Sequence, residues 1–158
     1  MLVRALSNLV EGLLLVMMVL LCADVFLGVF SRYVLRSTFT WYDEIARLLF
    51  VWIVFLGAAA AVRRGAHFRL HLLVDRMPPV PRRITRVVGV LVLMGVGLGL
   101  IQQGWTLVEL GQFQRTPVMG LSKQYIYASI PAGGILIIVY SLPLLWAAIR
   151  GAPDEATP

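Results

Sequence analysis

The residues best placed to do chemistry are two carboxylates, Glu11 and Asp24, inside an apolar segment near the N-terminus. A charge inside a membrane costs about 2.5–3.5 kcal/mol on insertion scales, so such residues usually serve a function. The two carboxylates lie on different sides of a helix, because they are thirteen positions apart. Glu11 lies near one end of the segment, which indicates an interfacial position or a contact with another subunit. Asp24 lies deeper.

A charged partner for Asp24 is available on the next apolar segment. If the first two segments form an antiparallel pair, Asp24 and Arg47 lie at nearly the same depth. An Asp24–Arg47 ion pair is therefore one hypothesis. The alternative is a local pair between Asp43 and Arg47, which are four positions apart on one helix. The sequence leaves both pairings open.

Two histidines, His67 and His71, are also four positions apart, a spacing that suits a metal site on one face of a helix. The one nearby carboxylate is Asp75, and the surrounding arginines repel cations. A haem held by two histidines would need them on separate helices at membrane depth. We therefore interpret the pair as part of an interfacial helix face and expect no metal, haem or other cofactor.

The composition identifies the solvent in which this chain folds. Of its 158 residues 59% are hydrophobic and 14% are charged, and the mean hydropathy is +0.85. Soluble domains carry about 25% charged residues. No phosphate-binding loop, nucleophile elbow or catalytic triad pattern occurs, so no enzyme activity is predicted. The net charge of +6 is not read as a sign of nucleic-acid binding, because most basic residues lie between apolar segments, where they set topology and contact lipid.

Four apolar segments predict an all-α integral membrane protein with four transmembrane helices. They cover about residues 9–30, 43–62, 86–108 and 124–149, each near the ~20 residues that cross ~30 Å of hydrocarbon. The second is the shortest, and a buried or re-entrant helix is its alternative. Residues 1–150 form one membrane domain, and 151–158 form a polar tail that is expected to be disordered.

Small and cyclic residues mark special points in the last two segments. Gly95, Gly97 and Gly99 make one stretch of the third segment thin enough for close helix contact. Pro131 and Pro143 lie inside the fourth segment and are expected to kink it.

The distribution of basic residues predicts the orientation. Nine of them fall on one side of a four-span protein: Arg4, Arg63, Arg64, Arg69, Arg76, Arg82, Arg83, Arg86 and Arg150. Five fall on the other side and are offset by three carboxylates: Arg32, Arg36, Arg47, Arg115 and Lys123, against Asp43, Glu44 and Glu109. Positive charge stays in the cytoplasm, so both termini are predicted to be cytoplasmic.

Residues 32–71 carry a specific pattern. It consists of an Arg-Tyr pair after the first span, a Trp and an acidic pair before the second, then Phe-Leu-Gly-Ala, basic residues and a His. This pattern resembles the small permease subunit of tripartite ATP-independent periplasmic (TRAP) transporters, the DctQ-like family. The matching positions are Arg32, Tyr33, Trp41, Asp43, Glu44, Arg47, the Phe55–Ala58 stretch with Gly57, and Arg63 to His67; Asn8 and Glu11 match an Asn-x-x-Glu near the N-terminus.

The resemblance implies a role in a three-part importer of the bacterial inner membrane. A periplasmic solute-binding protein would capture an organic acid, such as a C4-dicarboxylate, and a large permease subunit would import it on a sodium gradient. The small subunit would hold the large permease in the membrane and help to dock the binding protein. It would bind neither substrate nor Na+ itself. The matching residues Arg32, Trp41, Asp43, Glu44 and Arg47 would lie at the periplasmic end, as partner contacts or as local caps and anchors.

Two other functions are considered. An autonomous four-helix transporter would use Glu11 as its proton site, and a membrane anchor of a redox complex would bind haem. No span is expected to offer a broken helix with convergent polar groups, which is how secondary transporters build their binding sites. This favours the subunit of a larger importer.

Overall fold

The computed structural model describes residues 2–36, 41–65 and 79–150. Its helices are α1 (Leu2–Tyr33), α2 (Trp41–Gly65), α4 (Pro79–Gly111), α5 (Gln124–Tyr127) and α6 (Ser129–Arg150). Four segments are long and apolar enough to cross a membrane: Leu6–Tyr33, Trp41–Arg63, Ile84–Gly111 and Gln124–Ile149. The prediction of four transmembrane helices is therefore confirmed. The tail at 151–158 lies outside the described residues.

Helix is the form that lets each span satisfy its own backbone hydrogen bonds in lipid. The longest helices exceed the length that is needed to cross the hydrocarbon core of a bilayer. The 32 residues of α1, for example, reach roughly 48 Å. With 25 residues, α2 is also long enough to cross. This length supports a spanning α2 rather than a re-entrant helix.

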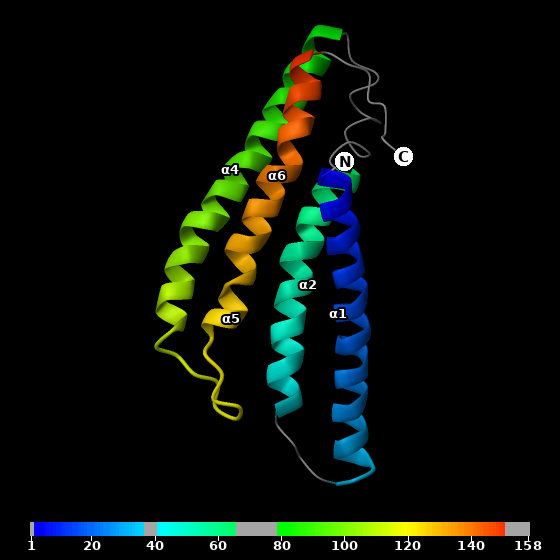
Figure 1. Cartoon of the computed structure of the whole chain (residues 1–158), viewed down its shortest axis with the longest axis vertical. Coiled ribbons are helices and arrows are strands. Elements are labelled where there is room, and N and C mark those ends of the chain that lie inside the picture. The colour runs from blue at the N-terminus through cyan, green and yellow to red at the C-terminus, as the bar shows by residue number, and fades with distance from the viewer. Residues whose placement is uncertain (1, 37–40, 66–78, 151–158) are drawn as a thin grey trace.

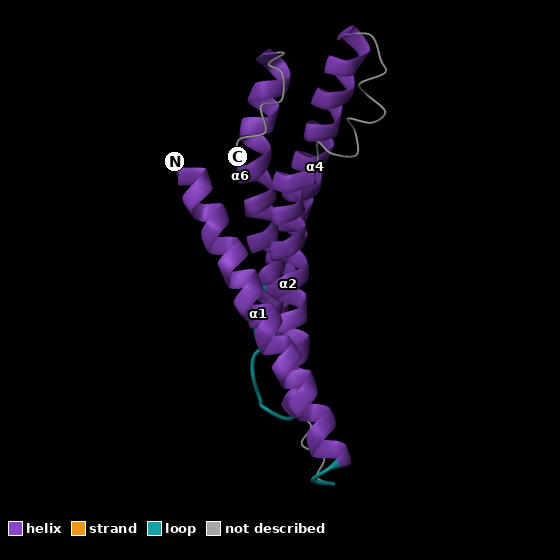
Figure 2. Ribbon diagram, turned by 90° about the vertical axis from the view of Figure 1, so that its right-hand side faces the viewer, coloured by secondary structure: helices purple, strands orange, loops and turns teal. Residues whose placement is uncertain are grey.

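The helices are arranged in a row in the order α1, α2, α6, α4 (Figure 1). The first two form one antiparallel hairpin, and α4 and α6 form another beside it. The end of the row at which α1 and α4 begin is named the terminal end. The opposite end, at which these two helices finish, is named the turn end. Figure 2 shows that α1, α6 and α4 spread apart toward the terminal end.

Two small apolar clusters hold the row together. Val10, Met17 and Leu56 join α1 to α2. Ala59, Ile137 and Tyr140 join α2 to α6. Large apolar side chains elsewhere are widely exposed, above all along α1 and α4. Such surfaces are stable only when lipid or another membrane protein covers them.

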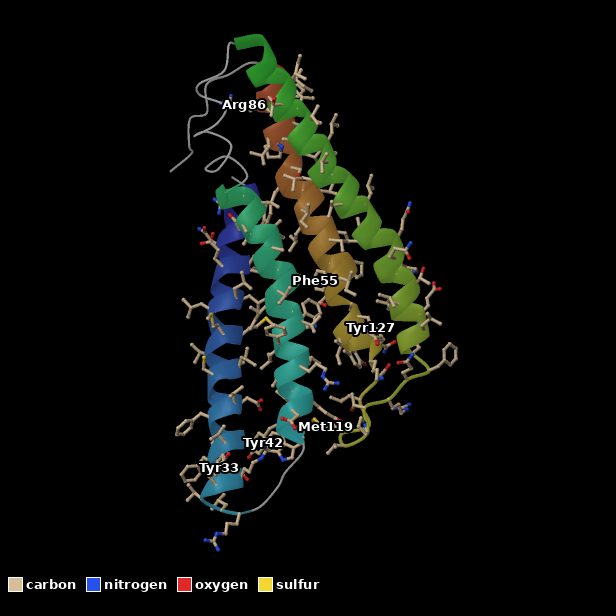
Figure 3. The ribbon with its side chains drawn as sticks, turned by 180° about the vertical axis from the view of Figure 1, so that it is seen from behind. Tyr33, Tyr42, Phe55, Arg86, Met119 and Tyr127 are labelled. Carbon is tan, nitrogen blue, oxygen red and sulfur yellow. The ribbon has the colours of Figure 1, made fainter. Side chains whose placement is uncertain are left out.

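Glycines allow the closest approaches in the row. A Cβ on Gly133 would lie 2.8 Å from Cβ of Phe55 on α2, and one on Gly134 would lie 2.8 Å from the carbonyl oxygen of Gly97 on α4. Two consecutive residues of α6 thus face its two neighbours, and Phe55 lies at the α2–α6 contact (Figure 3). Of the three glycines predicted to make close contact, only Gly97 does so within the described residues. A Cβ on Gly95 or Gly99 would meet nothing within 4 Å.

The last span is interrupted at Ala128, between α5 and α6. Pro131 explains the break, because its ring would clash with the carbonyl group of Tyr127 four residues earlier in a continuous helix. The interruption places Pro131 in the first turn of α6, where its missing N–H does no harm. Ala128 keeps helical dihedrals (φ −59°, ψ −22°), so the interruption is slight and α5 and α6 still form one span, Gln124–Ile149. An interruption of this kind could leave a polar group without a partner. However, the polar group beside the break is satisfied locally, because the Ser129 hydroxyl donates to the Ile126 carbonyl at 2.7 Å. Pro143 lies inside α6.

Candidate partner-binding surface

The carboxylate of Glu44 is the centre of the polar contacts at the turn end. Glu44 lies in the first turn of α2, yet it accepts hydrogen bonds from backbone N–H groups 74 and 75 positions away. Val118 donates at 2.8 Å and Met119 at 2.9 Å. The Thr116 side chain lies close to the same carboxylate. Bonds to an ionised acceptor are about twice as strong as neutral ones, so this contact ties α2 firmly to the α4–α5 connection.

The segment that Glu44 holds is a compact turn, Thr116–Leu121. The Thr116 N–H donates to the Leu121 carbonyl at 2.8 Å, and the Gly120 N–H returns to the Thr116 carbonyl at 3.1 Å. Gly120 has a φ of +66°, which favours glycine because it has no side chain. Arg115 fastens the turn from outside, since its Nη1 donates to the Gly120 carbonyl at 3.1 Å. The backbone of the turn is therefore closely defined.

Further bonds fasten the base of the turn. Ser122 donates its hydroxyl to the Gly111 carbonyl at 3.1 Å, and Lys123 Nζ donates to Gln114 Oε1 at 3.1 Å. The Trp52 indole N–H donates to the Tyr125 carbonyl at 2.9 Å. Trp52 thus provides a second link between α2 and the start of the last span.

The turn presents apolar side chains outward. Val118, Met119 and Leu121 are 48%, 43% and 38% exposed. Figure 3 shows Met119 on the side of the molecule where α2 begins, in the region of Tyr42. We define the turn-end surface as the Thr116–Leu121 turn together with the exposed Arg32 and Tyr33 at the end of α1 and the exposed Asp43 near the start of α2.

Most predicted interface residues gather at that same end. Arg32 and the 75%-exposed Tyr33 close α1. At the start of α2, Trp41 lies half-buried with its ring centroid 3.8 Å from that of Tyr42, and Asp43 is exposed. The structure therefore brings the Arg-Tyr pair and the Trp-acidic motif to one end of the α1–α2 hairpin.

At the terminal end the predicted Glu11 has a partner within the chain. Arg63 of α2 approaches it with Nη1 3.4 Å from Oε1, and about 30% of each side chain is exposed. The Tyr140 side chain from α6 is buried nearby, among Leu6 and Val62. Asn8, one turn earlier on α1, is exposed. The sequence pointed to Glu11 but did not identify Arg63 as its partner.

The hypothesis of an Asp24–Arg47 ion pair is not supported within the described residues. Asp24 is 8% exposed, and its Oδ2 has no hydrogen-bond partner there. Arg47 is exposed and is not within ion-pair distance of Asp24 or Asp43. Depth was predicted well, because Gly28, one turn from Asp24, packs on Tyr42. Equal depth along the hairpin is therefore not enough to pair Asp24 with Arg47.

The remaining predicted residues contribute less to the site. A Cβ on Gly57 would meet nothing within 4 Å, so this position on α2 is open. His67 and His71 lie outside the described residues. In the part of the chain that is described, no three His, Cys, Asp or Glu residues are grouped to hold a metal ion.

Sequence reasoning missed the attachment of the turn to Glu44, although one signal for the turn was present. Thr116-Pro117 followed by Gly120 is a turn pattern, because proline fixes φ and glycine accepts a positive φ. Nothing in the sequence indicated which carboxylate would fill the turn, because its partner is more than 70 positions away.

Comparison with known protein families decides what this arrangement belongs to. Residues 17–151 match the family described as tripartite ATP-independent periplasmic transporters, DctQ component. The chain belongs to this family. The resemblance seen in the Arg32–His71 region is thereby confirmed over most of the chain, and the protein is a TRAP transporter small permease subunit.

Individual relatives agree with the DctQ assignment. A Haemophilus influenzae protein named as a TRAP transporter small permease is 30% identical over 113 residues, which cover 72% of this chain and 70% of the relative. The sialic acid TRAP transporter small permease SiaQ of Vibrio cholerae is 26% identical over 143 residues, covering 90% and 82%. The sialic acid TRAP transporter permease SiaT of Haemophilus influenzae is 32% identical over 111 residues, covering 70% of this chain but 18% of SiaT.

Membership of the DctQ family and four apolar helices establish the location. The chain is a multi-pass protein of the bacterial inner membrane.

Proposed function

We propose that this chain is the small membrane subunit of a sodium-coupled importer of an organic acid. In this role it scaffolds the large permease subunit and helps to dock the periplasmic solute-binding protein. The match to the DctQ component over residues 17–151 is the observation that carries the proposal. Sialic acid, named for two relatives, and C4-dicarboxylates, named for the DctQ protein of Rhodobacter capsulatus, are candidate solutes.

A lateral scaffold fits the exposed apolar faces. The helices form a row, so each hairpin leaves faces that its own chain does not cover (Figure 1). In SiaT the segment similar to this chain is 18% of a longer permease, which supports a large permease as the covering partner. We infer that lipid covers the remainder.

The orientation follows from charge. The terminal end is where α2 finishes at Gly65 and α4 begins at Pro79, and the sequence carries seven arginines from position 63 to position 86 and two more at 4 and 150. Arginine-rich ends stay in the cytoplasm. The turn end, with the Thr116–Leu121 turn, would then face the periplasm, where a solute-binding protein can reach it.

The alternatives have less support. An autonomous transporter would need Glu11 as an isolated proton site, but Arg63 approaches that carboxylate. We expect Na+ to be used by the complex and not to bind this subunit. No haem or other cofactor is proposed.

Reconstitution tests the proposal. The tagged chain is purified in mild detergent and the captured membrane protein is identified by mass spectrometry; a large permease is expected. Vesicles with both subunits and the solute-binding protein should take up solute on a sodium gradient, whereas vesicles with this chain alone should not. Coupled uptake by this chain alone would refute the subunit function.

A further inference from the structure

We propose that Glu44 is a positioning residue, whose carboxylate holds the Thr116–Leu121 turn in the conformation that the solute-binding protein contacts. This inference rests on the proposed function, because it takes the turn end as the docking side. It assigns to Glu44 a role inside this chain, distinct from direct contact with a partner.

The hydrogen bonds of the turn are fully accounted for only when Glu44 is included. The N–H groups of Thr116 and Gly120 bond to carbonyl groups of the turn, and Leu121 N–H bonds to the Thr116 hydroxyl at 3.0 Å. Pro117 has no N–H. The two donors that remain, Val118 and Met119, are those that Glu44 accepts.

Two successive N–H groups that point to one anion form a concave anion site of the backbone. Here the anion is supplied by another element of the same chain. Without the carboxylate, Val118 and Met119 would have to find water, and the apex would lose its link to α2. The contact with Glu44 therefore determines both the backbone conformation at Val118 and Met119 and the position of these residues against the α1–α2 hairpin.

Glu44 contacts the backbone of the turn and leaves the apolar side chains of the turn exposed. Val118, Met119 and Leu121 remain 48%, 43% and 38% exposed while their backbone is fixed. A fixed loop loses less conformational freedom when it binds a partner, so less of the contact energy is spent on ordering. This is the property expected of a docking element.

The position of the turn favours the soluble partner over the membrane partner. It lies between the ends of two spans, Ile84–Gly111 and Gln124–Ile149, and not alongside either. A large permease is expected beside the spans, in the plane of the membrane. A periplasmic protein would instead approach the end of the row, where the turn lies.

The test measures uptake by the reconstituted two-subunit complex as the concentration of its cognate solute-binding protein is varied. In Glu44→Ala we expect the half-saturating concentration to rise about tenfold, with the maximal rate within about twofold of wild type. Glu44→Gln should shift it less, because the amide oxygen can still accept one N–H. Glu109→Gln is the matched control: it removes an exposed glutamate near the same end and should change neither value.

Hydrogen exchange provides a local readout. The amides of Val118 and Met119 should exchange faster in Glu44→Ala than in wild type, while the Glu109→Gln protein should match wild type. Co-purification with the large permease should be unchanged in all three variants.

Three results would count against the positioning role. Unchanged exchange at Val118 and Met119 would refute the hold itself. A parallel fall in complex yield and maximal rate, with the half-saturating concentration constant, would make Glu44 merely structural. Failure of the wild-type complex to respond to the binding protein would instead refute the proposed function, and the positioning role with it.

Discussion

Trp52 of α2 donates its indole N–H to the carbonyl oxygen of Tyr125 in α5 across 2.9 Å. The two residues are 73 positions apart and belong to different hairpins. The bond therefore joins the halves of the row at about three turns from the start of α2.

Replacing Trp52 by phenylalanine should weaken this joint. The change keeps most of the ring but removes the donor, so we expect a loss of about 1 kcal/mol, the usual net value of a hydrogen bond. Thermal unfolding in detergent, followed by circular dichroism, measures it. Trp105→Phe is the control, because Trp105 is 61% exposed and donates no such bond to any residue that the structure describes. Equal melting temperatures for the two variants would contradict the prediction.

The ion pair between Glu11 and Arg63 should show coupling in a double-mutant cycle. Arg63→Gln leaves the Glu11 carboxylate half-buried near lipid, and we expect a cost of roughly 1 kcal/mol because both groups are partly exposed. Glu11→Gln should cost a similar amount, and the double variant should cost less than the sum of the singles. Strict additivity would show that the pair contributes nothing.

Glycine positions on the α4–α6 pair should differ sharply in their tolerance of alanine. A Cβ on Gly134 would lie 2.8 Å from the Gly97 carbonyl oxygen, so Gly134→Ala should destabilise the isolated chain by about 1–3 kcal/mol. Gly99→Ala meets nothing within 4 Å and should be neutral or stabilising by up to about 1 kcal/mol. Unfolding of the purified chain tests both. A tolerated Gly134→Ala would contradict the packing described.

The Gly99→Ala variant can also show where the large permease binds. If Gly99→Ala leaves the isolated chain stable yet lowers its co-purification with the large permease, the open side of α4 lies against that partner. If Gly99→Ala changes neither the stability of the chain nor its co-purification with the large permease, lipid lies at this position.

The positive φ of Gly120 makes a prediction about the turn. Gly120→Ala should cost about 1 kcal/mol or more, because a Cβ is strained in this conformation even where space is open. Gly120→Asn should cost less, since asparagine accepts the left-handed region more readily. Hydrogen exchange of the Leu121 amide measures the loosening. The order alanine above asparagine above glycine is expected, and any other order would argue against a strained alanine.

The number and placement of the helices could be read from the sequence because lipid imposes a single rule. A span must be apolar and about 20 residues long, and hydropathy records both. Depth was also accessible, since Gly28, one turn from Asp24, packs on Tyr42 near the start of α2. The rotation of each helix about its own axis was not accessible, because the depth of Arg47 does not determine the direction in which its side chain points.

Long-range polar partners were the other limit. Charge and depth can suggest a partner for Asp24, but Glu44 is satisfied by backbone N–H groups, which every residue except proline possesses. A motif residue that contacts backbone leaves no complementary residue type to look for. For this reason the clustering of motif residues at the turn end was predictable, and the attachment of Glu44 to the turn was not.

A row that is one helix deep encloses nothing. Each described span has a neighbour on one or two sides and open flanks elsewhere, so the four described spans do not surround a lumen (Figure 1). Any aqueous conduit must be walled in large part by other polypeptides. Under the proposed function, these walls would belong largely to the large permease.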